Sequence, residues 1–256
     1  MVIKMKALIT GASTGLGKDF AIKLSKMGYD IVAVARNKDK LEELNEEVKT
    51  NLTIEVMDLS DKENAFKLHK KYSGKIDLLI NNAGFGECGS FEKTDLDKEL
   101  NMIDLNITTL HILTKLFYTD FVKKDKGQIL NVASIAAFQP GPLMATYYAS
   151  KSYVYNLTMA LYEENRRNKG NVKISVLCPG PTKTEFFDRA NVKFSIKPHT
   201  SEYVTEYALK KLQKNKLLIV PGLIPKLTVF SNRFAPRKFV MKIAYNITER
   251  KLYKEK

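Results

Sequence analysis

The sequence holds a tyrosine and a lysine that are spaced to act together in proton transfer. Tyr147 and Lys151 stand four residues apart, and Ser134 lies thirteen residues upstream of the tyrosine. Residues four apart share one face of a helix, so both side chains can point into one site. The neighbouring Tyr148 has no such partner, because the residue four positions after it is Ser152. This set predicts a group that donates a proton to a carbonyl oxygen.

The expected role of the lysine is electrostatic. A free phenol has a pKa of about 10, which is too high for efficient proton exchange near neutral pH. A lysine ammonium nearby favours the phenolate and should lower the pKa of Tyr147, and a general acid works best when its pKa lies near the operating pH. The alternative on this pattern alone is that Tyr147 is a core residue and Lys151 a solvated surface charge.

A glycine-rich segment near the N-terminus indicates a nucleotide site. Gly11, Gly15 and Gly17 lie between an apolar run and a helical pattern. Glycines there permit a tight turn and close approach of the backbone to a pyrophosphate at the helix N-terminus. The spacing differs from the common Gly-x-Gly-x-x-Gly fingerprint, so a strand–helix turn without a ligand stays open as an alternative. We expect the phosphate contacts to come from Ser13, Thr14 and the amide of Leu16.

The end of the second apolar run bears on which dinucleotide binds. A carboxylate there would bind a ribose 2′-hydroxyl and select NAD, whereas a nearby arginine accommodates the 2′-phosphate of NADP. The run ends in Val34-Ala35-Arg36-Asn37, without Asp or Glu. A guanidinium matches phosphate geometry, so Arg36 predicts NADP(H) as the cofactor. Asp58, after the third run, is expected either to meet the adenine amino group or to cap the next helix.

Short β-branched runs alternate with longer helical patterns along the chain. We predict strands over Ala7–Thr10, Asp30–Ala35, Thr53–Met57, Ile76–Asn81, Gln128–Ala133, Val172–Cys178 and Leu217–Val220. We predict helices over Gly15–Met27, Asp39–Lys49 with Asp39 as its cap, Asp61–Tyr72, Asp95–Lys123, Met144–Asn168 and Ser201–Lys214. This alternation implies a doubly wound α/β fold, a parallel sheet with helices on both faces. Ligands of such sheets bind outside the carboxyl ends of the strands, where the residues above would gather.

These residues, in this order, resemble the short-chain dehydrogenase/reductase family. The matching pieces are Thr10-Gly11-x-x-x-Gly15-x-Gly17, Asp58-Leu59, Asn81-Asn82-Ala83-Gly84, Asn106, Ser134, Tyr147-x-x-x-Lys151 and Pro179-Gly180-x-x-x-Thr184. The resemblance implies one Rossmann-type domain over residues 1–256 with a seven-stranded parallel sheet. It also implies reversible hydride transfer between a nicotinamide cofactor and a carbonyl or alcohol.

The resemblance assigns roles to single residues as well. Tyr147 would be the acid/base, Ser134 would place the substrate oxygen, and Lys151 would bind the nicotinamide ribose and lower the pKa of the tyrosine. Asn106 would hold a water that links Lys151 to solvent. The remaining cofactor contacts would come from Leu59, Asn82, Ala83, Gly84, Pro179, Gly180, Thr182 and Thr184.

The same resemblance places a substrate lid at about residues 184–200, with Phe186, Phe187, Phe194 and Ile196 in it. An apolar pocket would also use Phe85, Phe138, Pro140, Leu143 and Met144, although roughly half of all these side chains would fill the core on composition alone. Such a pocket suits a hydrophobic ketone or aldehyde. The commonest family members end in a glycine-rich turn that builds a tetramer interface. This chain lacks that turn, and we expect a homo-oligomer, a dimer first.

Composition limits the other classes. The chain has 256 residues, and its two cysteines, Cys88 and Cys178, suggest neither a disulfide framework nor a zinc site. We therefore expect a reducing, cytoplasmic compartment and, with the three histidines scattered, no metal. Met1–Thr10 is too short for a secretory signal, and no apolar run reaches the ~20 residues of a membrane-spanning helix.

The net charge of +14 allows nucleic acid, a membrane surface or a phosphorylated ligand as partner. Most of the excess lysines are spread singly, so we expect a solvated surface and no nucleic-acid partner. Residues 223–256 form a basic, apolar extension that could lie on an anionic membrane surface or against a partner subunit. The sequence predicts an NADP(H)-dependent carbonyl reductase or alcohol dehydrogenase. The alternatives are an NADPH-binding regulator with little catalysis and a membrane-peripheral steroid or long-chain acyl reductase.

Overall fold

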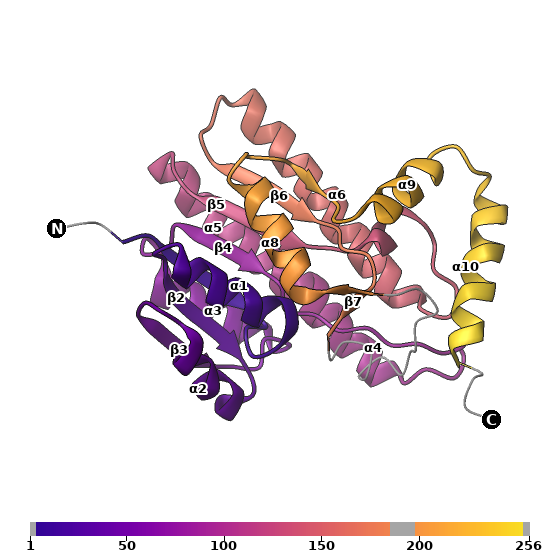
Figure 1. Cartoon of the computed structure of the whole chain (residues 1–256), viewed down its shortest axis with the longest axis horizontal. Helices are drawn as coiled ribbons and strands as arrows, with labels where there is room; N and C mark the ends of the chain where they lie inside the picture. The colour runs from indigo at the N-terminus through magenta and orange to yellow at the C-terminus, as the bar shows by residue number, and fades with distance from the viewer. Residues whose placement is uncertain (1–3, 185–197, 253–256) are drawn as a thin grey trace.

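The computed structural model of the chain describes residues 4–184 and 198–252, arranged around a central parallel sheet (Figure 1). Seven strands pair in the order β3-β2-β1-β4-β5-β6-β9, which confirms the predicted doubly wound fold. Their bounds are β1 Lys6–Thr10, β2 Asp30–Ala35, β3 Leu52–Val56, β4 Leu78–Asn81, β5 Gln128–Val132, β6 Lys173–Leu177 and β9 Leu218–Ile219. A second pair of short strands, β7 Thr182–Lys183 and β8 His199–Thr200, lies beside the sheet.

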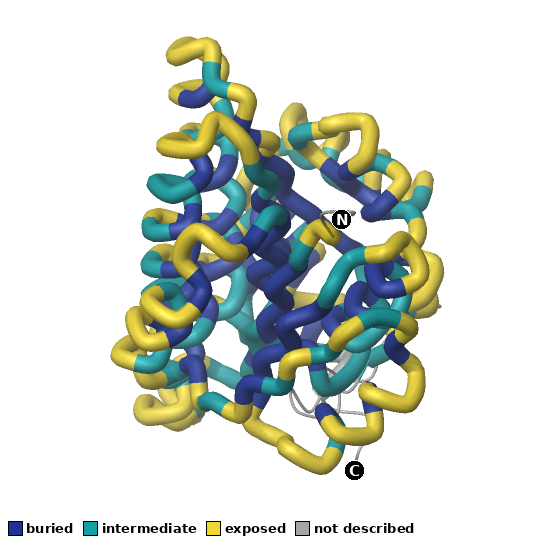
Figure 2. Tube along the Cα trace, turned by 90° about the vertical axis from the view of Figure 1, so that its left-hand side faces the viewer, coloured by how far each residue is buried: buried dark blue, intermediate teal, exposed yellow. Residues whose placement is uncertain are grey.

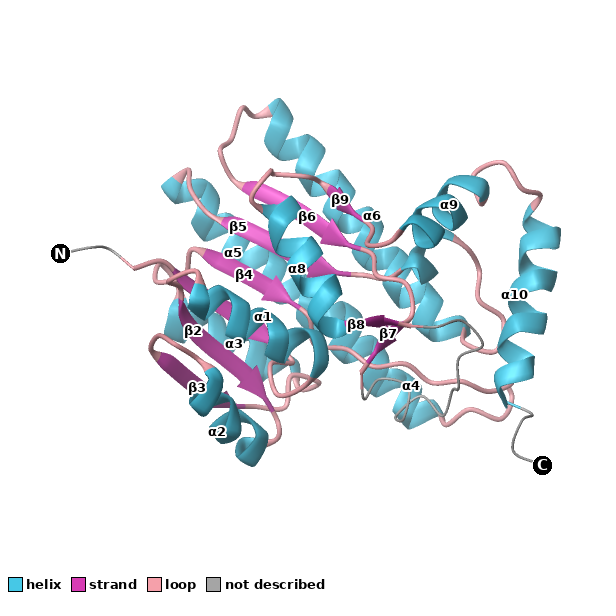
Figure 3. Cartoon of the chain, in the orientation of Figure 1, coloured by secondary structure: helices cyan, strands magenta, loops and turns pink. Residues whose placement is uncertain are grey.

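Helices cover both faces of this sheet (Figure 3). On one face lie α1 Gly15–Lys26, α2 Lys38–Glu47 and α8 Ser201–Leu212. On the other lie α3 Lys62–Tyr72, α5 Leu110–Lys124 and α6 Ala145–Arg167. The remaining helical segments are α4 Leu96–Ile103, the π-helix η1 Asp104–Thr109, the 3-10 turn η2 Ile135–Phe138, α9 Leu223–Ser231 and α10 Arg237–Leu252.

The strands are buried on both sides, which explains their continuous apolar sequences. In β1, Ala7 and Ile9 join the core beneath α1 and α8, whereas Leu8 points the other way and packs beneath α3 and α5. This alternation follows from the two-residue period of a strand. Figure 2 shows buried residues at the centre of the molecule and mostly exposed residues around them. The sheet is thus a rigid support for whatever its carboxyl edge carries.

The predicted long helix over Asp95–Lys123 is interrupted. A π-helical turn separates α4 from α5 and contains Asn106, whose side chain is fully buried. A π turn adds a residue to the helical repeat and occurs often at functional sites. Sequence periodicity missed it because the apolar residues on either side still repeat at helical spacing.

The expected cap of α2 is wrong, and one of the two roles considered for Asp58 is not present. Asn37, not Asp39, caps α2, since its side-chain oxygen accepts a hydrogen bond from the amide of Lys40 at 2.9 Å. Asp61 caps α3, so Asp58 does not have that role. The amides left unpaired in the first turn of a helix are satisfied by the residue whose backbone has the right extended conformation. Sequence alone identifies that residue only to within a position or two.

Candidate active site

A cavity of about 950 Å³ opens beyond the carboxyl ends of the central strands. Most of the predicted site residues line it, as the topology of a doubly wound sheet requires. They are Gly11, Ser13, Thr14, Gly15, Leu16, Arg36, Asp58, Leu59, Asn82, Ala83, Gly84, Ser134, Tyr147, Lys151, Pro179, Gly180, Thr182 and Thr184. Gly17 and Asn106 do not line the cavity. These two residues lie behind the residues that line the cavity.

The glycine-rich turn between β1 and α1 forms the near end of the cavity. Gly11 and Gly15 have φ values of +67° and +52°, a backbone region that favours glycine. The side-chain amide of Asn82 donates hydrogen bonds to the carbonyl oxygens of Thr10 at 3.0 Å and Gly11 at 3.2 Å. Gly17 lies so close to this turn that a Cβ would stand 2.1 Å from the Gly11 carbonyl oxygen. Gly17 therefore shapes the turn and does not itself face the cavity.

We expect the Gly17→Ala variant to lose about tenfold in NADPH affinity, a change of about 1.4 kcal/mol. The methyl group would push the turn away from its present position and cost about 1–3 kcal/mol of stability by overpacking. Gly28→Ala is the matched control. Gly28 has a φ of +90° but no atom within 4 Å of its added Cβ. The Gly28→Ala variant should therefore be less stable but should bind NADPH as the wild type does. Isothermal titration and thermal melts separate the two effects, and equal NADPH affinity in wild type and Gly17→Ala would contradict the interpretation.

Arg36 and Asp58 form the rim of the cavity at the ends of β2 and β3. Their side chains form an ion pair, with Nη1 of Arg36 3.7 Å from Oδ2 of Asp58, and both stay about half exposed. Burial works to raise the pKa of Asp58, but hydrogen bonds from Ser60 and the charge of Arg36 outweigh it and lower the pKa. The guanidinium is therefore held at the rim by a carboxylate while part of it still faces solvent.

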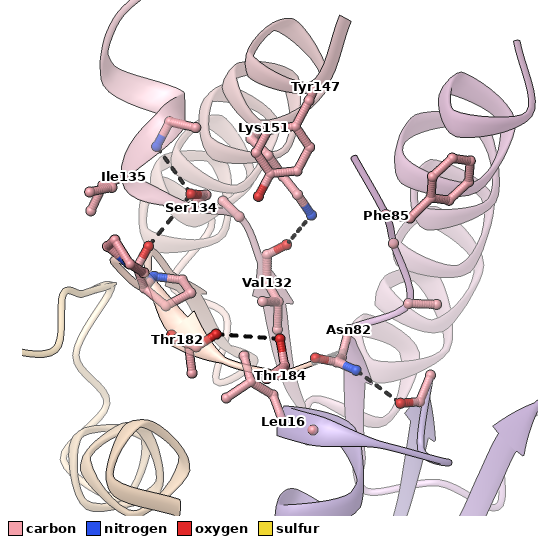
Figure 4. Close-up of a pocket in the computed structure, with 18 of the residues that line it drawn as sticks. Leu16, Asn82, Phe85, Val132, Ser134, Ile135, Tyr147, Lys151, Thr182 and Thr184 are labelled. Carbon is pink, nitrogen blue, oxygen red and sulfur yellow. Dashed lines mark hydrogen bonds between the residues drawn. The ribbon is translucent and has the colours of Figure 1, made fainter. Parts of the chain in front are cut away.

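Tyr147, Lys151 and Ser134 meet in the middle of the cavity (Figure 4). Both Tyr147 and Lys151 lie in α6, one turn apart, and the amine lies 5.8 Å from the centre of the phenol ring. The Lys151 amine donates a hydrogen bond to the Val132 carbonyl oxygen at 3.1 Å, which fixes it against the end of β5. The Ser134 hydroxyl oxygen accepts a hydrogen bond from the Ala136 amide at 3.1 Å. The predicted grouping of the three side chains is thus present in the structure.

The electrostatics of this group correct one expectation. Burial raises the pKa of Tyr147 above that of a free phenol, and the hydrogen bond with Ser134 offsets only part of the rise. Burial also lowers the pKa of Lys151 to about 8. Desolvation penalises the charged form of each group, and this effect outweighs the lowering of the tyrosine pKa that the sequence suggested. Tyr147 is therefore protonated at neutral pH, the state that a proton donor needs.

Asn106 lies directly behind this group, in the π turn. Its side-chain amide donates to the Phe85 carbonyl oxygen at 2.9 Å and to the Ser150 hydroxyl at 3.1 Å, and its oxygen accepts from the Phe85 amide at 3.1 Å. A Cβ at Gly84 would lie 2.7 Å from that oxygen and 3.3 Å from the Lys151 amine. Asn106 thus anchors the segment after β4 next to the lysine, and its water-holding role stays a prediction.

The far end of the cavity contains residues that sequence reasoning did not assign to it. Tyr148 lines it, with its ring packed so tightly on Gly141 that a Cβ there would stand 2.2 Å away. Other lining residues that were not predicted include Gln139, His199, Leu223, Ile224, Pro225, Thr228 and Ile247. The last five come from α9 and α10, so the C-terminal extension forms part of the wall. No pattern in the sequence signalled this, because contact with the cavity depends on how the two helices turn back.

The predicted apolar pocket is partly present. Phe85 and Met144 line the cavity. Phe138 instead packs on Tyr155 in the core, with ring centroids 4.7 Å apart, and neither Pro140 nor Leu143 lines the cavity. The predicted lid residues Phe186, Phe187, Phe194 and Ile196 lie outside the described residues, as does most of the 184–200 segment.

The family model for short chain dehydrogenases matches residues 5–193, which include the glycine turn and the Tyr147 group. The chain belongs to the short-chain dehydrogenase/reductase family. It is 34% identical over 183 residues to an uncharacterized oxidoreductase of Staphylococcus epidermidis, covering 70% of this chain and 78% of that one. It is 35% identical over 191 residues to the 3-oxoacyl-[acyl-carrier-protein] reductase of Rickettsia conorii, covering 73% of this chain and 76% of that one.

A solved structure extends the similarity of this family member to nearly its whole length. A short-chain dehydrogenase from Sphingobium yanoikuyae in complex with NADPH has a TM-score of 0.81 at 26% identity, covering 93% of this chain and 95% of that one. The family model itself ends at residue 193. In this short-chain dehydrogenase/reductase, α9 and α10 therefore lie beyond the part that the family model matches, although they help to form the cavity.

Within residues 4–184 and 198–252, no three His, Cys, Asp or Glu side chains are grouped so that they could hold a metal ion. Among the helices in those same ranges, none has the length and apolar character needed to cross a bilayer.

Proposed function

We propose that the protein is an NADP(H)-dependent oxidoreductase that interconverts a carbonyl and a primary or secondary alcohol. The observation that supports it most is the meeting of Tyr147, Ser134 and Lys151 with the glycine turn on one cavity. A proton donor and a dinucleotide cradle on one surface are what a hydride-transfer enzyme needs. The NADPH complex of the Sphingobium relative and the reductase activity named for the Rickettsia relative support the same proposal.

The residues of the cavity fit a dinucleotide. Gly11 and Gly15 line the cavity without side chains of their own, and α1 begins at this turn, which is the arrangement that receives a pyrophosphate. NADPH, when bound, supplies a hydride to the carbonyl carbon of the substrate. Arg36 supports NADP(H) over NAD(H), because its guanidinium can pair with a 2′-phosphate and the carboxylate of Asp58 is paired with that guanidinium.

The chain's own groups supply the proton and the orientation. As the carbonyl carbon gains the hydride, its oxygen develops negative charge and takes the proton of the Tyr147 hydroxyl. The Ser134 hydroxyl can hydrogen-bond the same oxygen and hold it facing the tyrosine. The positive charge of Lys151 stabilises the phenolate that is left. In alcohol oxidation the same steps run in reverse, with the phenolate as the base.

The substrate end of the cavity favours an apolar ketone or aldehyde. Its wall includes Met144, Tyr148, Leu223, Ile224 and Ile247, which present mostly carbon atoms to the ligand.

We also propose that the protein is a cytoplasmic homodimer. Light scattering of the purified chain tests the oligomeric state.

The pKa of Lys151 predicts a pH dependence. Raising the pH through about 8 removes the charge of Lys151, and with it the stabilisation of the Tyr147 phenolate. We therefore expect kcat/KM for NADPH, which reports groups of the free protein, to be level near pH 7 and to fall about tenfold per pH unit well above 8. In a Lys151→Arg variant that retains activity, kcat/KM should no longer fall above pH 8, because arginine stays charged. A flat profile up to pH 10 would contradict the assignment.

Oxidation of NADPH by the purified protein, measured against aldehydes, ketones, quinones and ketosteroids, tests the proposed function. Turnover that follows one apolar carbonyl class would support it. Tight NADPH binding without turnover on any of them would instead favour the regulator that remains the alternative.

A further inference from the structure

We propose that α9, α10 and their connection dock on the surface of an anionic lipid bilayer. This goes beyond the proposed reaction and does not depend on it. The two helices stand at one end of the molecule, with α10 outermost (Figure 1). They combine apolar side chains that the rest of the described chain leaves uncovered with an excess of basic residues.

The exposed face of α9 is apolar. Leu223, Ile224, Leu227 and Phe230 recur at the spacing that places residues on one side of a helix, and they are 71%, 66%, 57% and 64% exposed. The opposite side of the helix faces the protein, where Pro225 is buried and the Lys226 amine lies 5.3 Å from the ring centre of Tyr207. Phe230 packs on the ring of Phe234, with ring centroids 5.2 Å apart, but the apolar side as a whole stays largely exposed. Such exposure is costly in water and favourable at a bilayer interface.

The connection and α10 continue this surface. Phe234, between the helices, is 71% exposed. In α10, Val240, Ala244 and Thr248 form a buried stripe toward the protein, while Phe239, Ile243 and Ile247 form a second apolar stripe that stays exposed. A helix held by one apolar stripe does not need another. The second stripe thus indicates an apolar environment outside the chain.

The charges select an anionic surface. Between Leu223 and Glu249 the sequence has five basic residues, Lys226, Arg233, Arg237, Lys238 and Lys242, and one acidic residue, Glu249 itself. Arg237 and Lys238 stand in the first turn of α10, which has no acidic residue. Basic residues there oppose the helix dipole, so they do not serve the stability of the helix. Anionic headgroups would compensate them.

A second copy of the chain fits this surface less well. In a two-fold interface the same patch meets itself, so the exposed basic residues of one copy, among them Arg237, Lys238 and Lys242, would face those of the other. Like charges brought together at an interface are unfavourable. A bilayer that contains anionic lipids complements both the charge and the apolar side chains.

The surface is continuous with the cavity. Leu223, Ile224 and Ile247 are exposed and also line the cavity. Docking would therefore place the apolar end of the cavity next to the acyl chains. If the proposed reaction holds, an apolar carbonyl compound dissolved in the bilayer could enter without crossing water.

Vesicle co-sedimentation of the full chain tests the docking without any turnover. We expect the protein to bind vesicles of phosphatidylcholine with phosphatidylserine and to remain in the supernatant with phosphatidylcholine alone. Vesicle binding should weaken on the order of 100-fold in a variant that combines Arg237→Gln, Lys238→Gln and Lys242→Gln, since each basic residue near such a surface contributes roughly fivefold. Phe230→Ser combined with Phe234→Ser should also abolish sedimentation. Both sets change exposed side chains, and thermal melts check that folding is kept.

The matched control removes three positive charges elsewhere. Lys123→Gln, Lys126→Gln and Lys214→Gln change exposed lysines near the amino ends of the strands or after α8, and they should leave vesicle binding nearly unchanged. If this control loses as much vesicle binding as the α10 variant, the loss follows from net charge alone, and the proposal is overturned. Absence of binding to anionic vesicles would also overturn it, as would a shift from dimer to monomer in the Phe230/Phe234 variant, which would assign the surface to a second copy.

Discussion

Replacing Tyr147 with phenylalanine is expected to lower NADPH-dependent carbonyl reduction by roughly 10²- to 10⁴-fold, the usual contribution of a positioned general acid. Phenylalanine keeps the ring and its packing in α6 but has no hydroxyl to protonate the substrate oxygen. Because the glycine turn and Arg36 are untouched, NADPH binding should stay nearly the same. Steady-state rates together with NADPH fluorescence titration measure the two quantities separately.

The Tyr153→Phe variant is the control for this experiment. Tyr153 lies in the same helix, and its hydroxyl pairs with Nδ1 of His111 at 2.7 Å, away from the cavity. It should retain wild-type turnover. Unchanged turnover in Tyr147→Phe would remove the tyrosine from the mechanism, whereas a joint loss of turnover and NADPH binding would point to a structural role.

Exchanging Arg36 for aspartate is expected to lower NADPH affinity about 10- to 100-fold, since a hydrogen bond to a charged group is worth about 1.5–3 kcal/mol. The new carboxylate would repel the 2′-phosphate and Asp58 alike. NADH should bind as well as before or better, because a carboxylate at the end of the second strand accepts hydrogen bonds from ribose hydroxyls. The ratio of the two dissociation constants, measured by titration, is the informative quantity.

Lys38→Asp makes the same change of charge two residues further along the chain. Lys38 pairs with Glu42 at 3.4 Å and does not line the cavity, so the NADPH-to-NADH ratio should barely move. If both variants shift the ratio equally, the effect is one of general charge. If neither shifts it, the 2′-phosphate argument fails.

Much of the site could be predicted because its residues follow strands. Gly11 and Asn82 come directly after a strand and Ser134 two residues after one, and a parallel sheet brings such residues to one edge whatever the details of packing. Tyr147 and Lys151 needed only helical spacing. These relations are local in sequence, and the fold preserves them.

Other features depend on long-range packing and could not be predicted. The π turn at Asn106 leaves the local apolar pattern intact, and Tyr148 reaches the cavity only because Gly141 makes room for its ring. The pKa of Tyr147 rises because the folded protein desolvates it, which a tyrosine–lysine spacing does not report. The cavity-lining role of α9 and α10 likewise depends on where two helices return after the last strand.

The position of α9 and α10 after β9 also has a consequence for the order of synthesis. Strand β9 pairs with β6 through Leu218 and Ile219 at one edge of the sheet, and the other six strands all precede it. A chain leaving the ribosome therefore exposes the glycine turn, Ser134, Tyr147 and Lys151 before Leu223 is made. Domains generally fold as units during synthesis. Because β9 belongs to the same sheet as the earlier strands, we expect the cavity and its apolar wall to form together, only after α10 has left the ribosome.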